Sequence, residues 1–561
     1  MRVLMVAPRG FDHDAVNYTY LFPLGLAYIS SVLKRAGHEV DCLNVNHFSG
    51  LGKDIVQRSL TSGKPYDFLL TGGLSTSYRQ IKMVTDAVHE SPTDTGLILG
   101  GGIISSEPEL MFNTFKPGFI VMGEGESTIV DLLACLENQG DLAKIAGIGY
   151  RSSGGKFIAN KPRKPIEDLD AIPLPDFEGF EFENYLDHIR PCDHYFYDHF
   201  DNPRVYPIIC SRSCPFRCTF CFHPIGNKYR QRSVDSVMEE LAVMVKRYRI
   251  NTIAIYDELF SNNLPWVQEF CRRIVELFKE LSWECKWCCQ MRVDTVDEEM
   301  LQLMKDAGCY MVSYGLESHS QKVLKSMKKH ITSAHIDQAV SITLRNNLSL
   351  QGNFIFGDVA ETAQTAQETL DYWKQNSTLG IVLGFISPYP GSEIYQRCLE
   401  RGIIKDKLDF IENHITDTLN MTEAMTAEEF EKLRFDIHQA ELRYRIFGTL
   451  RSVKRMSNGL YNIKGICPHC HKLIEYSNYL ISFKSYVFCM MYCRACRHRF
   501  YLASRLYRMI NWTLLLTYDL LPGRTKVIAF RIYRRVTKTK PFIKRAIQRF
   551  RLKGWQADRV I

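Results

Sequence analysis

Hydrophobic residues near the start of the chain fall into short continuous runs, separated by stretches in which they recur every three or four positions. Continuous runs are typical of strands buried on both faces, and the recurring pattern is typical of amphipathic helices. One predicted helix opens at Pro23 and stops at Gly37, a residue that favours helix ends. The alternation predicts a flavodoxin-like, doubly wound parallel sheet over residues 1–165. Its predicted strands are residues 3–7, 39–44, 68–71, 96–99 and 119–122.

The same alternation resumes after residues 166–204, a predicted linker rich in proline, acidic and aromatic residues. Six β/α units in series predict a partial (β/α)6 barrel of the TIM type over residues 205–424, with its chemistry at the carboxyl ends of the strands. Residues 425–500 then predict a helical segment and a four-cysteine module, and residues 501–561 a basic helical tail. The six predicted barrel strands are residues 205–210, 252–256, 286–291, 311–314, 350–356 and 381–387.

The composition indicates an ordinary folded protein. The 561 residues are 45% hydrophobic and 24% charged, which excludes a disordered chain and a small disulfide scaffold and predicts two or three domains. No run of eighteen apolar residues predicts a membrane span. The N-terminal sequence MRVLMVAPRG has no apolar signal region behind it, so we expect a cytoplasmic protein.

The net charge of +8 is unevenly distributed. Residues 501–561 hold fifteen Lys or Arg and two Asp, so the first 500 residues carry a net charge of about −5. Any attraction to phosphate or anionic lipid therefore belongs to the tail. Its apolar stretch, residues 509–516, is compatible with peripheral contact with an anionic membrane, with docking on the barrel, with nucleic-acid phosphates, or with a solvated helix.

Glycines cluster where three predicted strands of the first sheet end. They are Gly72-Gly73, Gly100-Gly101-Gly102 and the Gly123-Glu124-Gly125-Glu126 segment. The carboxyl ends of parallel strands form the crevice in which open α/β sheets bind ligands. Glycine also serves tight turns, so a binding crevice and local turns are both compatible with this pattern.

Eighteen cysteines in a chain without a signal peptide favour metal ligation or buried thiols over disulfides. Cys214, Cys218 and Cys221 follow the first barrel strand. Three thiolates within eight residues can hold one face of a 4Fe-4S cluster and leave the fourth iron without a protein ligand. An open iron can coordinate a substrate, which favours catalysis over electron storage. A zinc knuckle and a chance clustering of cysteines are the alternatives.

This motif, with Phe220 at its aromatic position, resembles the CxxxCxφC pattern of the radical S-adenosylmethionine superfamily. The resemblance implies that the open iron binds S-adenosyl-L-methionine, which is then cleaved reductively to a 5′-deoxyadenosyl radical. It also implies contacts to S-adenosylmethionine by Phe220 within the motif and by residues at the ends of later strands. The residues concerned are Asp257 and Glu258 after the second strand, Glu317 and Ser318 in a GxES segment after the fourth, and Gly357 in the turn that contains Glu361.

Some residues near these motifs depart from the family pattern or have two interpretations. Val359 and Ala360 replace the usual Pro-Gly in the turn after the fifth strand. His223 follows the last cysteine, and we expect it to pack or to form a hydrogen bond near the cluster rather than bind it. Arg292 has two interpretations, as a contact to the cofactor carboxylate and as an ordinary ion pair.

The first domain resembles the cobalamin-binding-type domain that is fused to many radical enzymes, on residues 22–28, residues 35–40 and the strand-end glycines. The resemblance implies a corrinoid between this domain and the barrel mouth. The DxHxxG sequence that supplies an axial histidine is absent, because Asp12-His13-Asp14 has the wrong spacing. A domain that keeps the fold without a corrinoid is the alternative. The residues implied in cobalamin binding are Ser75, Thr76, Gly100, Gly101, Gly102, Gly123 and Glu124.

The radical methylthiotransferases of transfer RNA also begin with a doubly wound domain. They need three cysteines there for a second cluster, whereas this chain has only Cys42 and Cys135 before residue 190. That interpretation is therefore weak.

Two CxxC knuckles follow the barrel, with Cys467 and Cys470 in one and Cys493 and Cys496 in the other. Paired knuckles of this spacing fix four thiolates tetrahedrally, and a strand-like stretch over residues 479–488 suits a zinc ribbon. A second iron–sulfur cluster is the rival assignment. A closed site of four thiolates predicts a structural or recognition role rather than catalysis.

Together these features predict a cobalamin-dependent radical S-adenosylmethionine enzyme. The resemblance implies methylation of an unactivated carbon, a small-molecule or lipid-like substrate, and an electron donor such as flavodoxin or ferredoxin. Two alternatives remain open: cyclisation or rearrangement without methyl transfer, and an inactive binding or scaffold protein. The intact set of three cysteines argues against the second.

Overall fold

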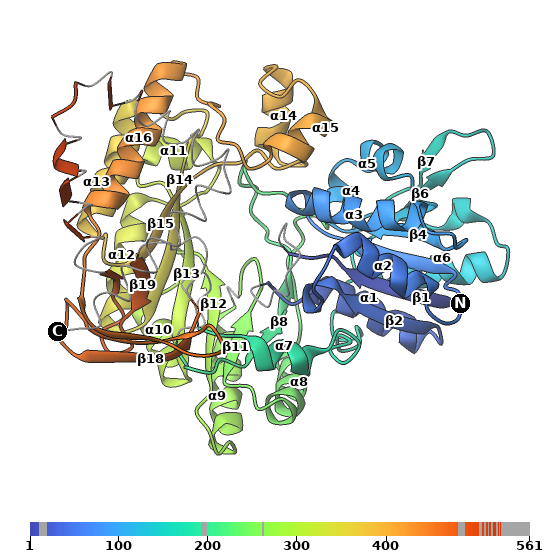
Figure 1. Cartoon of the computed structure of the whole chain (residues 1–561), viewed down its shortest axis with the longest axis horizontal. Coiled ribbons are helices and arrows are strands. Elements are labelled where there is room, and N and C mark those ends of the chain that lie inside the picture. Colours follow the sequence, from blue (N-terminus) through green and yellow to red (C-terminus); the bar gives the residue numbers. More distant parts are fainter. Residues whose placement is uncertain are drawn as a thin grey trace.

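A computed structural model of the chain describes residues 1–10, 20–191, 199–260, 263–480 and 488–503, with isolated residues between 508 and 528. Over these residues, no helix is long and apolar enough to span a bilayer. Most of the predicted basic tail lies outside the described residues, as do Asp12, His13 and Asp14. Two α/β units lie side by side in Figure 1, the N-terminal one in blue and the second in green and yellow.

The N-terminal unit is one sheet with the strand order β2-β1-β3-β4-β5-β6-β7. Its first five strands are parallel, as predicted for a doubly wound sheet, and an antiparallel β6–β7 extension was not predicted. Alternate residues of β1 enter two separate cores, which explains its continuous hydrophobic run. The strands are β1 (Arg2–Ala7), β2 (Glu39–Asn44), β3 (Phe68–Gly72), β4 (Gly96–Gly100), β5 (Phe119–Val121), β6 (Ile148–Arg151) and β7 (Phe157–Ala159), and the helices are α1 (Leu24–Arg35), α2 (Gly52–Thr61), α3 (Tyr78–His89), α4 (Gly102–Ser106), α5 (Pro108–Phe115) and α6 (Glu126–Glu137).

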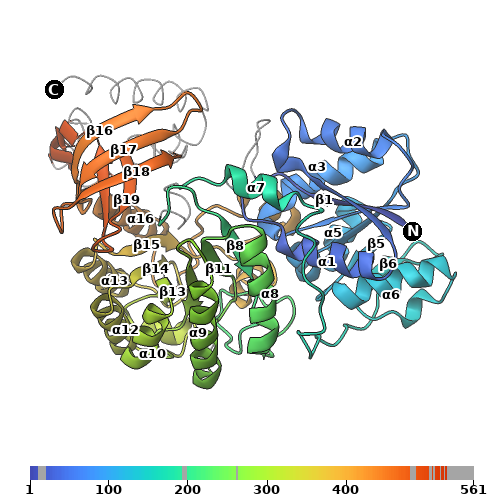
Figure 2. The same ribbon diagram turned by 90° about the horizontal axis from the view of Figure 1, so that it is seen from below.

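The second unit is a partial barrel of six parallel strands in sequential order, as predicted. Helices follow the strands and cover the outer face (Figures 1 and 2). The strands are β8 (Val205–Ile208), β11 (Thr252–Ile255), β12 (Lys286–Met291), β13 (Cys309–Glu317), β14 (Ser349–Phe356) and β15 (Gly380–Phe385). The helices are α8 (Val234–Arg247), α9 (Leu264–Lys279), α10 (Glu298–Asp306), α11 (Gln321–Ser326), α12 (Ser333–Arg345), α13 (Ala363–Gln375), α14 (Glu393–Glu400) and α15 (Lys407–Asp409).

The segment predicted as a linker is packed into the protein. It contains α7 (Phe182–His188), and the rings of Phe177, Phe180 and Phe182 are almost fully buried. They share one hydrophobic core with residues of both α/β units, among them Phe22 and Tyr206. The aromatic content that suggested an irregular connection therefore fills the space between the two units.

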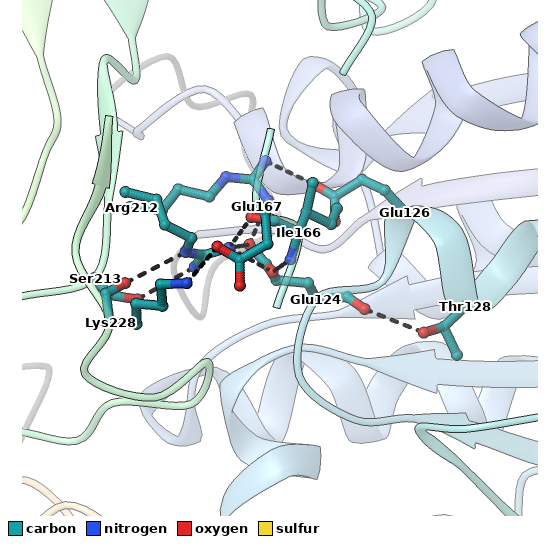
Figure 3. Close-up of polar contacts among 9 residues, drawn as sticks. Glu124, Glu126, Thr128, Ile166, Glu167, Arg212, Ser213 and Lys228 are labelled. Carbon is teal, nitrogen blue, oxygen red and sulfur yellow. Dashed lines mark hydrogen bonds and ion pairs between the residues drawn. The ribbon is translucent and has the colours of Figure 1, made fainter. Parts of the chain in front are cut away.

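A buried ion cluster also joins the units (Figure 3). Glu124 and Glu126, directly after β5, pair with Arg212 and Arg230 from the segment that follows β8. A second and more exposed contact lies between Glu107 and Lys407, whose charged atoms are 2.9 Å apart.

The C-terminal module begins after α16 (Ala427–Arg443), which lies along α13 in Figure 1. It consists of a three-stranded antiparallel sheet, β16 (Thr449–Arg455), β17 (Tyr461–Ile466) and β18 (Leu473–Tyr479), and a hairpin, β19 (Phe488–Tyr492) and β20 (Arg499–Ala503). The strand predicted over residues 479–488 falls largely on 481–487, outside the described residues. Figure 2 shows the module at one end of the barrel, away from the N-terminal unit.

The module packs where the barrel strands begin, at the end opposite the predicted chemistry. The backbone N–H of Arg499 donates to the Thr378 carbonyl at 2.8 Å, and Arg494 forms an ion pair with Asp201 at 2.9 Å. Gly380, the first residue of β15, leaves room for the Tyr492 hydroxyl, because a Cβ atom there would overlap it.

We expect Gly380→Ala to destabilise the protein, because the added Cβ would overlap both the Tyr492 hydroxyl and the Leu350 carbonyl oxygen. Overpacking of this kind typically lowers the free energy of unfolding by about 1–3 kcal/mol. Denaturant unfolding of the purified variant measures the change. Gly25→Ala is the control, since nothing lies within 4 Å of its added Cβ. Equal stability of the two variants would contradict the docking described here.

Candidate functional site

The three predicted cluster cysteines lie on a loop at the carboxyl ends of the barrel strands. Two short strands in this segment, β9 (Ser211–Arg212) and β10 (Arg230–Gln231), pair in antiparallel fashion. Their pairing closes the base of a loop formed by residues 213–229, which we call the cysteine loop. Ser213 has a φ of +67°, a left-handed conformation that turns the chain just before Cys214. Cys218 is buried, Cys214 is half-buried and Cys221 is exposed.

The surroundings of these thiols fit a bound cluster. A hydrogen bond between the two thiols lowers the pKa of Cys218 to about 7 and raises the pKa of Cys221, so these two sulfur atoms lie close enough to share one proton. Among the described residues, Thr219 Oγ1 and His223 Nε2 are buried without a hydrogen-bond partner, and His223 Nδ1 has only the Glu258 carboxylate 3.4 Å away. Orphaned buried polar atoms are costly unless a ligand or water satisfies them. Their concentration on this loop is therefore compatible with an iron–sulfur cluster and its ligand.

Two adjacent carboxylates at the end of β11 have different environments. Asp257 is buried and accepts hydrogen bonds from the Cys210 N–H at 2.8 Å and the Ser211 hydroxyl at 2.7 Å. Burial raises the pKa of Asp257 to about 7. This side chain holds the chain that leads into the cysteine loop. Glu258 remains accessible, and its Oε2 atom lies 3.4 Å from Nδ1 of His223.

Glu317 is held by a lysine that sequence analysis missed. Its φ of +61° is unusual for a residue with a side chain, and its Oε1 atom lies 2.7 Å from Nζ of Lys329. A Cβ atom on Gly315 would overlap both charged groups, so this glycine makes room for the ion pair. Lys329 also interacts electrostatically with Cys218, which brings a cation close to the cysteine loop. The Lys328-Lys329 pair resembles ordinary surface charge in the sequence and gives no signal of this role.

Ser318 and Gly357 support local structure. The Ser318 hydroxyl is 1% exposed and hydrogen-bonds Thr369 at 2.9 Å. Gly357 has a φ of +97° and donates its N–H to Glu361 at 2.5 Å, so the turn forms without the usual Pro-Gly. Burial raises the pKa of Glu361 to about 8.

Arg292 forms the ion pair that was one of its two predicted roles. Two of its nitrogens lie 2.9 Å from the Asp294 carboxylate oxygens, and Nη2 donates to the Lys329 carbonyl at 2.9 Å. Its guanidinium carbon also lies 3.5 Å from the ring centre of Phe216, on the cysteine loop. Arg292 thus links the loop to the Glu317–Lys329 pair. Phe220 is half-buried and packs partly against a hydrophobic core.

The residues predicted to hold a corrinoid gather at the carboxyl ends of β3, β4 and β5. The glycines allow the strand-end loops to pack closely, because a Cβ atom on Gly101 would lie 2.7 Å from the backbone nitrogen of Gly73. Leu74 is 63% exposed at this edge and offers an apolar surface that suits one face of a macrocycle. Ser75 is buried and Thr76 is exposed. The edge therefore fits a large, partly apolar ligand.

Glu124 differs from the rest of this group. Its side chain is 4% exposed, and both carboxylate oxygens are engaged by Arg212, Arg230 and the Ile166 N–H. Gly123 beside it has a φ of +75°.

The concave face of the barrel carries uncharged polar side chains. Strand pairing places Gln290, Ser313 and Gln351 side by side, and Asn353 pairs with Val382 one row closer to the cysteine loop. Gln290, Asn353 and Val382 are exposed, whereas the intervening residues of these strands are buried under the outer helices. This face can therefore contact a ligand through hydrogen bonds without a formal charge.

The four distal cysteines converge although they come from two hairpins. Cys467 and Cys470 lie in the β17–β18 turn, and Cys493 and Cys496 lie in the β19–β20 turn. Across the hairpins, sulfur atoms are 3.7 Å apart for Cys467 and Cys496 and 3.5 Å apart for Cys470 and Cys493. All four sulfurs lie within 4.8 Å of one another. Zn–S bonds of about 2.3 Å in a tetrahedron place sulfurs ~3.8 Å apart, so the spacing fits a single metal ion.

Comparison with known families agrees with this arrangement. A model of the radical SAM superfamily matches residues 208–372, and a model of the B12 binding domain matches residues 15–133. The first span contains the cysteine loop and the second contains the strand-end glycines. Both resemblances predicted from the sequence are confirmed.

Individual relatives cover most of the chain. An uncharacterized methyltransferase of Pyrococcus horikoshii is 27% identical, over 73% of this chain and 85% of its own length. An anaerobic magnesium-protoporphyrin IX monomethyl ester cyclase of Rubrivivax gelatinosus is 27% identical, over 79% of each protein. The radical S-adenosylmethionine methyltransferase TsrM from Kitasatospora setae, solved with cobalamin and a 4Fe-4S cluster, has a similar fold, with a TM-score of 0.56 and 18% identity over 71% of this chain and 75% of that one.

We expect Glu361→Gln to reduce the pH dependence of stability. The folded-state pKa of Glu361 is about 8, above the ordinary carboxyl value of 4.5, so its contribution is complete below pH 4.5 and is lost as the pH rises through 8. Glutamine mimics the protonated acid and still accepts from the Gly357 N–H. Unfolding at pH 5 and pH 8.5 should show a smaller difference for the variant than for the unmodified protein. An unchanged difference would show that Glu361 is ionised in the folded state.

Proposed function

For a chain that joins a B12-binding domain to a radical SAM domain, we propose the methylation of an unactivated carbon in a small-molecule substrate. The observation that carries this proposal is the position of the cysteine loop. It lies between the barrel face that would hold the substrate and the strand-end glycines that would hold a corrinoid. The names of the Pyrococcus horikoshii relative and of TsrM support methyl transfer.

The family implies a 4Fe-4S cluster, S-adenosyl-L-methionine and cobalamin. We assign the cluster to Cys214, Cys218 and Cys221. When bound, the cluster supplies an electron for cleavage of S-adenosylmethionine, and the corrinoid supplies a transferable methyl group. A flavodoxin or ferredoxin type of protein is the electron donor that we propose.

The chain's own groups then orient S-adenosylmethionine. Glu258 is the accessible carboxylate beside the loop and suits the amino group of the methionine part. The Glu317–Lys329 pair offers one acceptor and one cation at the barrel rim, to which Arg292 is tied. Asp257 accepts hydrogen bonds from Cys210 and Ser211, so it would hold the segment before the cysteine loop rather than contact the ligand.

We assign the corrinoid to Ser75, Thr76, Gly100, Gly101, Gly102 and Gly123, with Leu74 against one face of the ring. The substrate would lie against the concave row of Gln290, Ser313 and Gln351, where carboxamides both donate and accept hydrogen bonds. A neutral polar group suits this row, because an ionic group would find no countercharge on these three side chains.

A second candidate is ring formation without methyl transfer. The Rubrivivax gelatinosus relative is named as a cyclase and matches 79% of this chain, compared with 73% for the Pyrococcus horikoshii methyltransferase. The two candidates share both cofactors and differ in whether S-adenosylhomocysteine forms.

For the C-terminal module we propose a zinc ribbon. The sulfur spacing fits one tetrahedral ion better than a cluster of several irons, which would spread the sulfurs further apart. Its docking at the start of the barrel strands favours a structural role.

The first test is anaerobic reconstitution with iron and sulfide, followed by reduction with S-adenosylmethionine and hydroxocobalamin. We expect about four irons per chain in the loop cluster, retained corrinoid, and both 5′-deoxyadenosine and S-adenosylhomocysteine. Cys218→Ala should lose the cluster and nearly all cleavage, and Cys271→Ala, at a buried cysteine outside the loop, should keep both. Deoxyadenosine without retained corrinoid would contradict the cobalamin part of the proposal, and cleavage by Cys218→Ala would contradict the cluster assignment.

A separate prediction concerns the four-cysteine site. Elemental analysis of the purified protein should give about one zinc per chain, and Cys470→Ser should lose it with a lower unfolding midpoint, because three thiolates hold the ion less tightly. Cys135→Ser is the control, since this cysteine lies in the N-terminal unit. Iron in place of zinc, with a visible charge-transfer band that Cys470→Ser removes, would contradict the assignment.

A further inference from the structure

The ion cluster between the two α/β units is compact and almost dry. Arg212 places its two terminal nitrogens 2.9 Å from Glu124 and 2.6 Å from Glu126, and Arg230 lies 2.8 Å from the other oxygen of Glu124. The four side chains are 3–12% exposed. Two positive and two negative charges balance, so the cluster carries no net charge into the interior.

The linker segment closes the cluster. The Ile166 N–H donates to Glu124 at 2.6 Å, and Arg230 donates to the Ile166 carbonyl at 2.6 Å (Figure 3). Three segments that are remote in sequence therefore meet at Glu124: the end of β5, the linker and the base of the cysteine loop. A carboxylate with this many donors has a fixed position and orientation.

Both arginines belong to the two short strands, β9 and β10, at the base of the cysteine loop. Arg212 on β9 pairs with Arg230 on β10, and the loop of residues 213–229 leaves and returns through this pair. Arg212 lies two residues before Cys214. Any movement of Glu124 relative to the barrel would therefore be transmitted to the base of the loop through two charged contacts.

On the N-terminal side, the ion cluster adjoins the strand-end loops that were predicted to hold a corrinoid. Gly123, next to Glu124, faces the cysteine loop closely enough that an added Cβ would lie 4.0 Å from the Pro224 carbonyl. A Cβ on Gly102 would likewise lie 4.0 Å from the ring of Phe222, directly after Cys221. The strand-end loops of the first sheet and the cysteine loop thus approach each other beside the ion cluster.

We propose that Glu124, Glu126, Arg212 and Arg230 are positioning residues that set the separation between the cluster site and the corrinoid site. This inference rests on the proposed function, because it presumes both cofactors. Guanidinium–carboxylate pairs are directional and fix orientation more than they add stability, which suits a joint between two rigid sheets. Glu124 acts in this role through the arginines and does not contact the corrinoid.

The test compares the unmodified protein with Glu126→Gln and Glu124→Gln, each loaded with reduced cluster and cob(II)alamin. Both cofactors are paramagnetic in this state, so electron paramagnetic resonance reports their magnetic coupling. We expect one well-defined coupling in the unmodified protein and a broadened or weaker coupling in both variants. Iron content and hydroxocobalamin affinity should stay within about twofold of the unmodified protein, because neither variant removes a ligand.

Lys407→Gln is the matched control, since it breaks a second ion pair between the units, in which neither Arg212 nor Arg230 takes part. It should leave the coupling unchanged. Glu126→Gln leaves Arg212 paired with Glu124, so it decides the question if Glu124→Gln does not fold.

An unchanged coupling in folded Glu126→Gln would overturn the proposal. Loss of hydroxocobalamin affinity by more than about tenfold in Glu124→Gln, with an unchanged coupling, would also overturn it and make Glu124 a corrinoid contact. Failure of the proposed function is distinguishable, because the unmodified protein would then lack the cluster or the corrinoid.

Discussion

Glu124 and Glu126 of the N-terminal unit form a buried ion cluster with Arg212 and Arg230 of the barrel. The arrangement of the site depends on this contact, because it links the loops of one sheet to those of the other. Both sheets are parallel, and each presents its functional loops at the carboxyl ends of its strands. Two such edges form one site only if something holds them against each other. Apolar packing by Phe177, Phe180 and Phe182 supplies adhesion, and the ion cluster supplies orientation, because charged hydrogen bonds depend on angle as well as distance.

Some carboxylates near the cysteine loop are hydrogen-bonded within the protein, and others remain exposed to solvent. Asp257 and Glu124 are engaged on both oxygens, whereas Glu258 is exposed. Residues adjacent in sequence can therefore have opposite roles. Asp257 organises the polypeptide and Glu258 is left to meet a ligand, because one points into the core and the other does not.

The C-terminal module stabilises the end of the barrel where the strands begin. Six strands do not close a barrel, so β15 remains an edge strand, and the glycine at its start leaves space beside it. Tyr492 and Arg499 fill part of this space against Gly380 and Thr378. A metal ion held by the four cysteines would join the two hairpins and add rigidity to a unit whose own core has about ten buried residues.

The sequence by itself predicted the two parallel sheets and the grouping of the cysteines into a set of three and a set of four. These features follow from local patterns: continuous hydrophobic runs, strand-end glycines and short cysteine spacings. Tertiary structure alone decided the role of Glu124, which a strand-end motif assigned to the corrinoid and which packing gives to two arginines. It also decided the pairing of Lys329 with Glu317 and the packing of residues 166–204. Those contacts join residues that are distant in the chain, and a single sequence carries no local signal of which charges meet after folding.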